Sequence, residues 1–471
     1  MQELLTLTLT ELCGRLRARE ATPVDLMQAV LERIDSVNPA LNAVVAMHER
    51  EALLAAARAA EERIGKGEAR PLEGIPLGVK DLEDTVGLVT SMGSVPFRER
   101  VATRDTTQVA RLKAAGAIVV GKTNAPEFGY TALTKNRVYG VTRNPWSLER
   151  TPGGSSGGSA AALASGMLPL VTASDGGGSI RIPASFTGAF GLKVSYGRVP
   201  AGPSELWPLG DTAVSGPLTR TVEDAALILD QVVGPSPGDP NSLPHPGISY
   251  LEAVRVPDAS GLRVGWSPDL GFGVVQSDVA EVVSDAVGVF EKLGARIAQV
   301  PDAPAGLARA WGRLGSLELA AQLHRHLPDH ESEFGRAFLA GVKLAWQVTP
   351  EELGDMLRQR ASLSRWCEEV FEHCDVLVTP TVPYDPPPAK GPFPAETEGR
   401  RQPTASVATF TIPFNLSWHP AATVRAGMSR AGLPVGMQIV GPRHRDDRVL
   451  QVARAFERER PWHPAWPEGS V

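Results

Sequence analysis

Apolar residues recur at helical spacing over several stretches of the chain. Thr22, Pro23 and Asp25 supply a cap, a proline at the first helical position and an acid in the first turn, which predicts an amphipathic helix that ends before Pro39. The same periodicity, with a capping box that begins at Thr349, predicts further helices over residues 49–66, 105–115, 155–166, 221–233, 277–293 and 447–457, and over most of 305–374.

Short apolar runs between these helices predict buried strands. They lie at residues 72–82, 117–121, 167–174, 261–266, 296–300, 375–381, 410–424 and 432–440. Strands that alternate with helices favour an α/β protein. The segments 234–247 and 380–394 are rich in proline and are predicted to be loops.

Composition narrows the class of protein. A chain of 471 residues with 42% hydrophobic residues can bury a large core, and by length alone it would form more than one domain. A formal net charge of -6 gives no reason to expect a nucleic-acid partner. Three cysteines, outside any metal-binding or disulfide spacing, favour a reducing compartment. Without a signal-peptide pattern or an apolar run of about 18 residues, we expect a cytoplasmic protein with no membrane partner.

Two glycine- and serine-rich clusters stand at residues 153–159 and 176–179. A flexible linker would have such a composition, but apolar segments of core length flank both clusters. Glycines between core elements indicate backbone at positive φ and N–H groups that point at a common position. The clusters are separated by about one helix and one strand, so we expect them to meet in space.

Lys80 stands in the apolar segment 72–82 and allows two interpretations. A lysine on an edge strand extends its ammonium into solvent, which is the commoner arrangement. A lysine held among apolar groups has a lowered pKa and can serve as a base.

Other motifs suggest competing chemistries. Residues 116–123 match the spacing of a phosphate-binding loop around Lys122, but their β-branched run and Pro126 favour a strand and a structural lysine. His324, His326 and His330 have a spacing that could hold a metal, yet supporting carboxylates are not evident, which favours a solvated helix face.

Three arrangements could supply a serine nucleophile. Residues 153–157 match the G-x-S-x-G turn around Ser155, with His419 and His444 as later histidines. The glycine triplet before Ser179 offers backbone N–H groups around a hydroxyl, as a nucleophile with an oxyanion hole requires. Lys80 could be the base in place of a histidine.

The order of these motifs resembles the amidase signature family. The matching segments are GVKD at 78–81, GGSSGGSAAA at 153–162 and SDGGGSIRIPAS at 174–185. The resemblance extends through GKTNAPEFG at 121–129, TRNPW at 142–146, GLKVSYGRVP at 191–200 and the segment 414–441, and so covers most of the chain.

The resemblance implies an amidase signature fold, a central mixed twisted sheet covered by helices on both faces. It further implies one domain over residues 1–471, with a helical N-terminal segment at about 1–66, a catalytic core at about 70–235 and a helical excursion at about 303–374. The excursion returns to the core.

The resemblance also implies the site. Ser179 matches the nucleophile, Ser155 the bridging serine that follows a cis peptide bond, and Lys80 the base. The N–H groups of Gly176, Gly177, Gly178 and Ser179 would hold the oxyanion. No metal or organic cofactor is required, and Asp175 and Arg181 are expected to be structural.

The resemblance further implies that the substrate is a small-molecule amide, cleaved to a carboxylate and an amine through an acyl-enzyme. Tyr130 matches a pocket-lining position of relatives, and Trp418, where many relatives have glycine, either shapes the acyl pocket or packs in the core. These aromatic residues suggest aryl or alkyl acyl groups. The segment GLKVS at 191–195 lacks a proline that is common in the family, a change expected to affect only a turn.

An alternative member of the family is the glutaminase component of the glutamine-dependent tRNA amidotransferase, which works within a multi-subunit complex. Those glutaminase chains usually read DTGGSIRQPA, whereas this chain has Gly176 and Ile182 in that segment. The difference favours a stand-alone bacterial amidase, for which a homodimer is one compatible assembly.

Overall fold

The computed structural model describes residues 2–202, 210–257 and 259–463. Its helices are α1 (Leu9–Arg17), α2 (Pro23–Leu41), α3 (Arg50–Gly65), α4 (Thr107–Ala114), α5 (Gly157–Ala164), α6 (Arg181–Thr187), α7 (Val222–Val232), α8 (Tyr250–Arg255), α9 (Ser277–Lys292), α10 (Leu307–Leu323), α11 (Leu327–His330), α12 (Arg336–Ala345), α13 (Pro350–His373), α14 (Ile412–Leu416) and α15 (Asp446–Glu459).

The strands of the described residues are short. They are β1 (Val44–Met47), β2 (Pro76–Lys80), β3 (Ile118–Thr123), β4 (Lys135–Asn136), β5 (Gly140–Val141), β6 (Leu170–Val171), β7 (Ser174–Asp175), β8 (Phe190–Lys193), β9 (Val214–Ser215), β10 (Leu218–Thr219), β11 (Arg263–Trp266), β12 (Arg296–Gln299), β13 (Val376–Pro380), β14 (Glu396–Thr397), β15 (Arg400–Arg401), β16 (Ala421–Met428) and β17 (Pro434–Val440).

The sequence predicted most of the longer elements, did not predict α1, α6, α8, β1, β8 or β10, and was wrong in three of its predictions. Helix α2 continues through Pro39 to Leu41, because a proline in the last turn removes only one hydrogen bond and Asn42 ends the helix in the left-handed conformation. The strand predicted at 167–174 is divided into β6 and β7. The segment 410–424 begins with α14, where Pro413 lies in the first turn, and only then forms β16.

The larger sheet is mixed and has the strand order β10-β8-β16-β17-β13-β11-β12. β11 runs parallel to β12 and β13, whereas β17 runs antiparallel to β13 and β16. All seven residues of β17 are buried, and successive side chains point to opposite faces, so both faces of the sheet are covered. Helices α6, α9 and α15 supply contacts to it. The predicted α/β class is confirmed.

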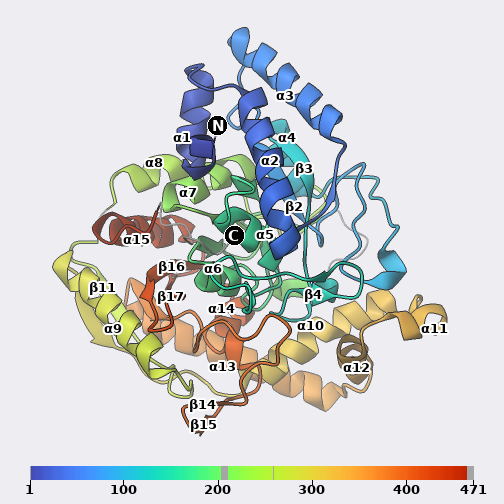
Figure 1. The fold of residues 1–471 in the computed structure, drawn as a ribbon. Coiled ribbons are helices and arrows are strands. Elements are labelled where there is room, and N and C mark those ends of the chain that lie inside the picture. The colour runs from blue at the N-terminus through green and yellow to red at the C-terminus, as the bar shows by residue number, and fades with distance from the viewer. Residues whose placement is uncertain (1, 203–209, 258, 464–471) are drawn as a thin grey trace.

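A second sheet, with the order β1-β3-β2-β6, holds Lys80 at the end of β2. β2 lies between two parallel neighbours, and Lys80 stands opposite Thr123 of β3. Figure 1 shows this sheet beneath the N-terminal helices α2 and α3, while α10 to α12 extend on the opposite side of the molecule.

Two clusters of buried hydrophobic residues stabilise the fold. The larger extends from Leu4 to Trp462 and includes residues of both sheets. The smaller joins Phe128 of the core to Leu323 and Phe338 of the helical excursion. Contacts of this kind support the prediction of a single domain, which stays a prediction.

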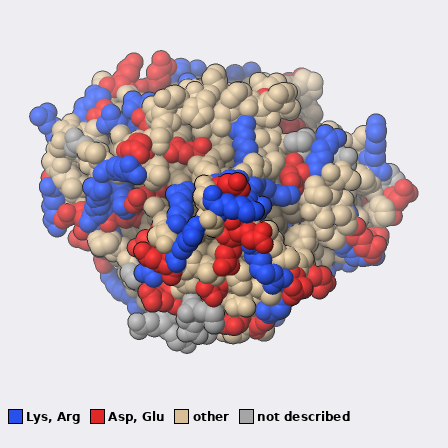
Figure 2. Space-filling model, turned by 90° about the horizontal axis from the view of Figure 1, so that it is seen from above, with Lys and Arg blue, Asp and Glu red and all other residues tan. Residues whose placement is uncertain are grey.

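Charged side chains of both signs are interspersed over the face shown in Figure 2. Among the described residues, no helix is long and apolar enough to cross a membrane.

The strands β1 and β3 of the second sheet approach each other closely at Gly121. A Cβ at this position would lie 2.1 Å from the carbonyl oxygen of Ala46 in β1. We expect Gly121→Ala to lower the free energy of unfolding by about 1–3 kcal/mol, measured by urea denaturation, because backbone would have to move.

Gly14→Ala is the matched control, because nothing lies within 4 Å of a Cβ at that exposed position of α1. It should leave stability unchanged or raise it by up to about 1 kcal/mol. A Gly121→Ala variant as stable as the wild type would contradict the close approach.

Candidate active site

Lys80 is completely buried, and its ammonium is surrounded by serine oxygens. Its Nζ donates to Ser155 Oγ at 2.8 Å, Ser156 Oγ at 2.8 Å and Ser174 Oγ at 2.9 Å, and lies 3.3 Å from the Ser174 carbonyl oxygen. The Lys80 backbone N–H donates to Thr172 Oγ1 at 2.9 Å, which fixes the end of β2. The arrangement excludes an edge-strand lysine that extends into solvent.

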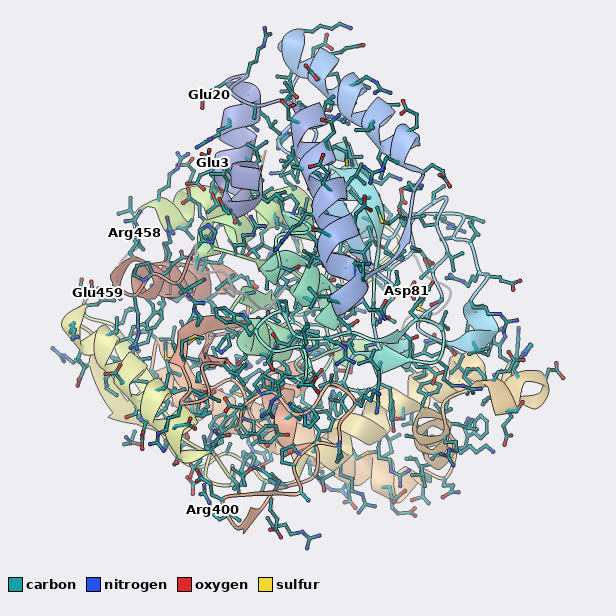
Figure 3. All side chains as sticks on the ribbon, in the orientation of Figure 1. Glu3, Glu20, Asp81, Arg400, Arg458 and Glu459 are labelled. Atoms are coloured by element: carbon teal, nitrogen blue, oxygen red, sulfur yellow. The ribbon has the colours of Figure 1, made fainter. Side chains whose placement is uncertain are left out.

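Burial lowers the pKa of Lys80 to about 7, and the nearby carboxylates of Glu83 and Asp175 oppose this shift. A large fraction of the side chain is therefore neutral near pH 7. Neutral lysine has a lone pair that can accept a proton from a hydroxyl. The next residue, Asp81, is also fully buried, whereas Arg400, at the lower margin of the molecule, is exposed; both are labelled in Figure 3.

The two glycine- and serine-rich clusters meet in space, as the sequence predicted. The backbone N–H of Ser156 donates to the carbonyl oxygen of Ser179 at 3.2 Å. The peptide bond between Gly154 and Ser155 is cis, as the family resemblance implies. Gly153 has φ +87°, and a Cβ there would lie 2.9 Å from Cα of Pro183 in α6, so this turn requires glycine.

An ion pair between Asp175 and Arg181 holds the second cluster. Both side chains are fully buried, and the guanidinium donates from Nε and Nη2 to the two carboxylate oxygens, each at 2.9 Å. Burial opposes ionisation of Asp175, but the Arg181 charge and hydrogen bonds outweigh it and keep the pKa of Asp175 well below its usual range. Asp175 also accepts the backbone N–H groups of Gly178 at 2.7 Å and Ile180 at 3.2 Å.

This pairing corrects the prediction that four N–H groups face a substrate oxyanion. The Gly178 N–H is used by Asp175 and is not available. The N–H groups of Gly176, Gly177 and Ser179 have no protein acceptor within the described part of the chain. Three donors therefore remain for a ligand at this turn.

Trp311 of α10 packs on the same turn, although no sequence motif marks it. Its Nε1 donates to the carbonyl oxygen of Gly176 at 2.5 Å, and a Cβ at Gly177 would lie 2.4 Å from its ring. Thr411 Oγ1 donates to the Gly177 carbonyl oxygen at 2.6 Å. These two bonds fix the carbonyl groups of Gly176 and Gly177 and thereby hold the path of the glycine turn.

A cavity of about 380 Å³ opens beside Ser179. Gly154, Gly177 and Trp311 line it, together with Ile182 and Phe393. A second compartment of about 470 Å³ shares the wall residues Tyr130, Pro403, Thr404 and Ala408 with the first, so the two are adjacent. Ser179 therefore lines one of two neighbouring compartments.

Of the two aromatic residues predicted to contact substrate, the structure brings Tyr130 to the cavity. Its ring packs edge-on against Phe338 with centroids 5.5 Å apart, and its hydroxyl lies against Gly341 of α12. Trp418 is not among the residues that line the cavity. Its indole stacks on Tyr196 at 4.8 Å and donates to the Asp211 carbonyl oxygen at 2.7 Å, the packing role that the sequence left open.

The competing motifs have other roles. Lys122 is buried in β3, where its Nζ donates to Thr90 Oγ1 at 3.0 Å and to the Glu83 carbonyl oxygen, so its segment is a strand and not a phosphate loop. His419 stacks on Phe371 at 5.1 Å, and neither it nor His444 lines the cavity, which removes the histidine that the G-x-S-x-G interpretation needs.

The three histidines of the helical excursion do not converge. His326 packs against Phe97, and His330 contacts Glu333 at 3.0 Å. Among the described residues, no group of three His, Cys, Asp or Glu side chains is placed to hold a metal ion.

Comparison with known proteins gives a consistent family. The family model described as Amidase matches residues 25–450. An acylamidase of Rhodococcus erythropolis is 36% identical over 484 aligned positions, which cover 100% of this chain and 99% of the relative. A glutamyl-tRNA(Gln) amidotransferase component of Roseiflexus sp. (strain RS-1) is 35% identical over 493 positions and 98% of each chain.

Comparison with solved structures indicates the same family. The crystal structure of a bacterial aryl acylamidase of the amidase signature family superposes with a TM-score of 0.90, at 29% identity over 97% of each chain. The chain therefore belongs to the amidase signature family, and it is a hydrolase that acts on amide carbon–nitrogen bonds.

Proposed function

We propose that this amidase transfers the acyl group of a linear carboxylic amide to Ser179 and then to water. The observation that carries the proposal is the hydrogen bond of 2.8 Å between Lys80 Nζ and Ser155 Oγ, beside the cavity that Ser179 lines. A buried lysine next to a hydroxyl is a base, and Ser155 connects this base to the nucleophile.

In the first half-reaction, neutral Lys80 accepts the proton of Ser155, and Ser155 accepts the proton of Ser179. Ser179 Oγ attacks the amide carbon, and the carbonyl oxygen becomes an oxyanion. The N–H groups of Gly176, Gly177 and Ser179 stabilise it, and loss of one such donor costs about 3–4 kcal/mol of transition-state binding in other hydrolases.

Collapse of the oxyanion breaks the carbon–nitrogen bond. The relay returns a proton through Ser155 to the departing amine, and the acyl group stays on Ser179. A water molecule then attacks this ester, gives its proton to the same relay and releases the carboxylate. The steps use no cofactor.

Aryl or alkyl acyl groups fit the apolar walls of the cavity. Tyr130, Trp311 and Phe393 offer aromatic surface near Ser179. The acylamidase and aryl acylamidase relatives support the same preference. The three buried free cysteines, Cys13, Cys367 and Cys374, suit the cytoplasmic location that we propose.

A serine-directed fluorophosphonate should form one covalent adduct, on Ser179, and Ser179→Ala should lose both the adduct and amide hydrolysis. The reason is that the hydroxyl beside the three free N–H groups is the nucleophile. Peptide mass spectrometry locates the adduct. An adduct on Ser155 in the wild type would overturn the assignment.

The pH dependence of kcat/KM should follow the protonation state of Lys80. Below its pKa of about 7 the side chain is protonated and cannot accept a proton, so kcat/KM should fall about tenfold per pH unit on the acid side and level off above it. Lys80→Ala should lose hydrolysis while its circular dichroism spectrum is retained.

Lys193 provides the matched control, because burial lowers its pKa to about 7 as well, whereas its Nζ donates to the Val194 carbonyl oxygen, 3.0 Å away. Lys193→Met should keep the profile of the wild type. A wild-type kcat/KM that does not change with pH around pH 7 would contradict the role of Lys80. A pH profile that is altered in Lys193→Met would contradict it as well.

The purified chain should hydrolyse aryl and alkyl amides without a partner and should have low glutaminase activity. A panel of aryl amides, short aliphatic amides, oligomeric ω-amino acid amides and glutamine measures this, and light scattering gives the solution mass of a monomer or homodimer. Glutamine as the best substrate would favour the amidotransferase component instead, which the Roseiflexus relative represents.

A further inference from the structure

The charges that line the two compartments differ from those of the whole chain. The chain has 53 acidic and 47 basic residues. The described lining of the cavity nevertheless has three arginines, Arg309, Arg313 and Arg401, and neither aspartate nor glutamate. All charged residues of this described lining are therefore cationic, with Arg309 and Arg313 in the outer compartment.

The three arginines are not equivalent. Arg309 is 75% exposed and pairs with Glu352 at 3.2 Å, and Arg401 is exposed on the β14–β15 hairpin. Arg313 is half-buried in the outer compartment. Among the described residues, no carboxylate lies within 4 Å of it.

Arg313 is fixed in place by the end of a helix. Its Nη1 donates to the carbonyl oxygen of Leu344 in the last turn of α12. This bond uses one of the five N–H groups of the guanidinium and leaves an edge free for another acceptor. Arg313 also lies near Tyr130, since its charge opposes the rise that burial causes in the pKa of the Tyr130 phenol.

Tyr130 is a wall residue of both compartments. A substrate that is bound at Ser179 and extends along Tyr130 would therefore reach the compartment of Arg313. The walls there, Phe272, Leu307 and Ile412, are apolar and suit a hydrocarbon chain or ring. A planar guanidinium at the end of an apolar channel matches a carboxylate in shape and charge.

We propose that Arg313 binds a carboxylate at the end of the substrate remote from the scissile amide. The preferred substrates are then amides that carry a carboxylate on an apolar chain or ring, on either the acyl side or the amine side. The proposal rests on the proposed reaction at Ser179 and adds the substrate class. A purely structural Arg313, which only caps α12, is the competing explanation.

The test compares matched substrates with the wild-type enzyme. One series consists of anilides whose acyl chain, of increasing length, ends in a carboxylate, an isosteric neutral nitro group or an ammonium group. A second series places the same end groups on the amine. We expect kcat/KM to be at least about tenfold higher for the carboxylate in one series, mainly through a lower KM, because a charge-assisted hydrogen bond gives that discrimination.

Variants then assign the preference. Arg313→Gln should lower kcat/KM for the carboxylate substrate about tenfold and change the nitro substrate less than about twofold, and Arg313→Glu should favour the ammonium substrate. Arg358→Gln on α13 is the matched control. That arginine is exposed and pairs with Asp355, so its loss changes the net charge equally without touching the cavity.

Equal kcat/KM for carboxylate and nitro substrates in both series overturns the proposal, and this comparison needs no variant to fold. If Arg313→Gln lowers kcat/KM for both substrates equally and also lowers the melting temperature, the proposal is overturned. Arg313 would then only cap α12. Failure of the proposed reaction is distinguishable, because hydrolysis would then persist in Ser179→Ala.

Discussion

The buried ion pair of Asp175 and Arg181 is the interaction on which the active-site turn depends. Its carboxylate accepts backbone N–H groups on either side of Ser179, so the pair sets the path of the chain around that residue. Arg181 extends the connection to the Gln438 amide oxygen of β17 at 2.7 Å and to Asn415 of α14 at 2.6 Å. The turn is thus fixed to the centre of the larger sheet. Removal of one partner of such a pair typically destabilises a protein by about 3–5 kcal/mol.

The same pair explains why the turn is rich in glycine. One N–H of the triplet bonds to Asp175, while Trp311 and Thr411 donate to carbonyl oxygens of the triplet. The N–H groups of Gly176, Gly177 and Ser179 are left without a protein partner among the described residues, and Gly177 and Ser179 line the cavity. The backbone must turn tightly here, so that some of its N–H groups bond within the protein while others stay available for a ligand. Gly178 allows this turn because it adopts φ +128°, a conformation that favours glycine.

The two basic side chains that serve the proposed reaction differ in burial. Lys80 is fully buried among neutral hydroxyls, and desolvation favours its neutral form, as a base requires. Arg313 is only half-buried and presents a planar fork of N–H donors, as recognition of an anion requires. In the proposed reaction, the core of the protein thus supplies the base, and the helical excursion supplies part of the cavity wall.

The sequence by itself determined the α/β class, most helices and strands, and the motifs of the family, because these depend on local periodicity and on glycine and serine spacings that a short segment contains. It could not place Trp311 or Arg313, which lie on an amphipathic helix without a motif, more than 130 residues from the glycine turn. It also assigned four N–H groups to the oxyanion, since only the tertiary structure decides that Asp175 uses that of Gly178. Which aromatic residue faces the cavity was likewise decided by packing, which directed Tyr130 toward Gly341 and Trp418 toward Tyr196.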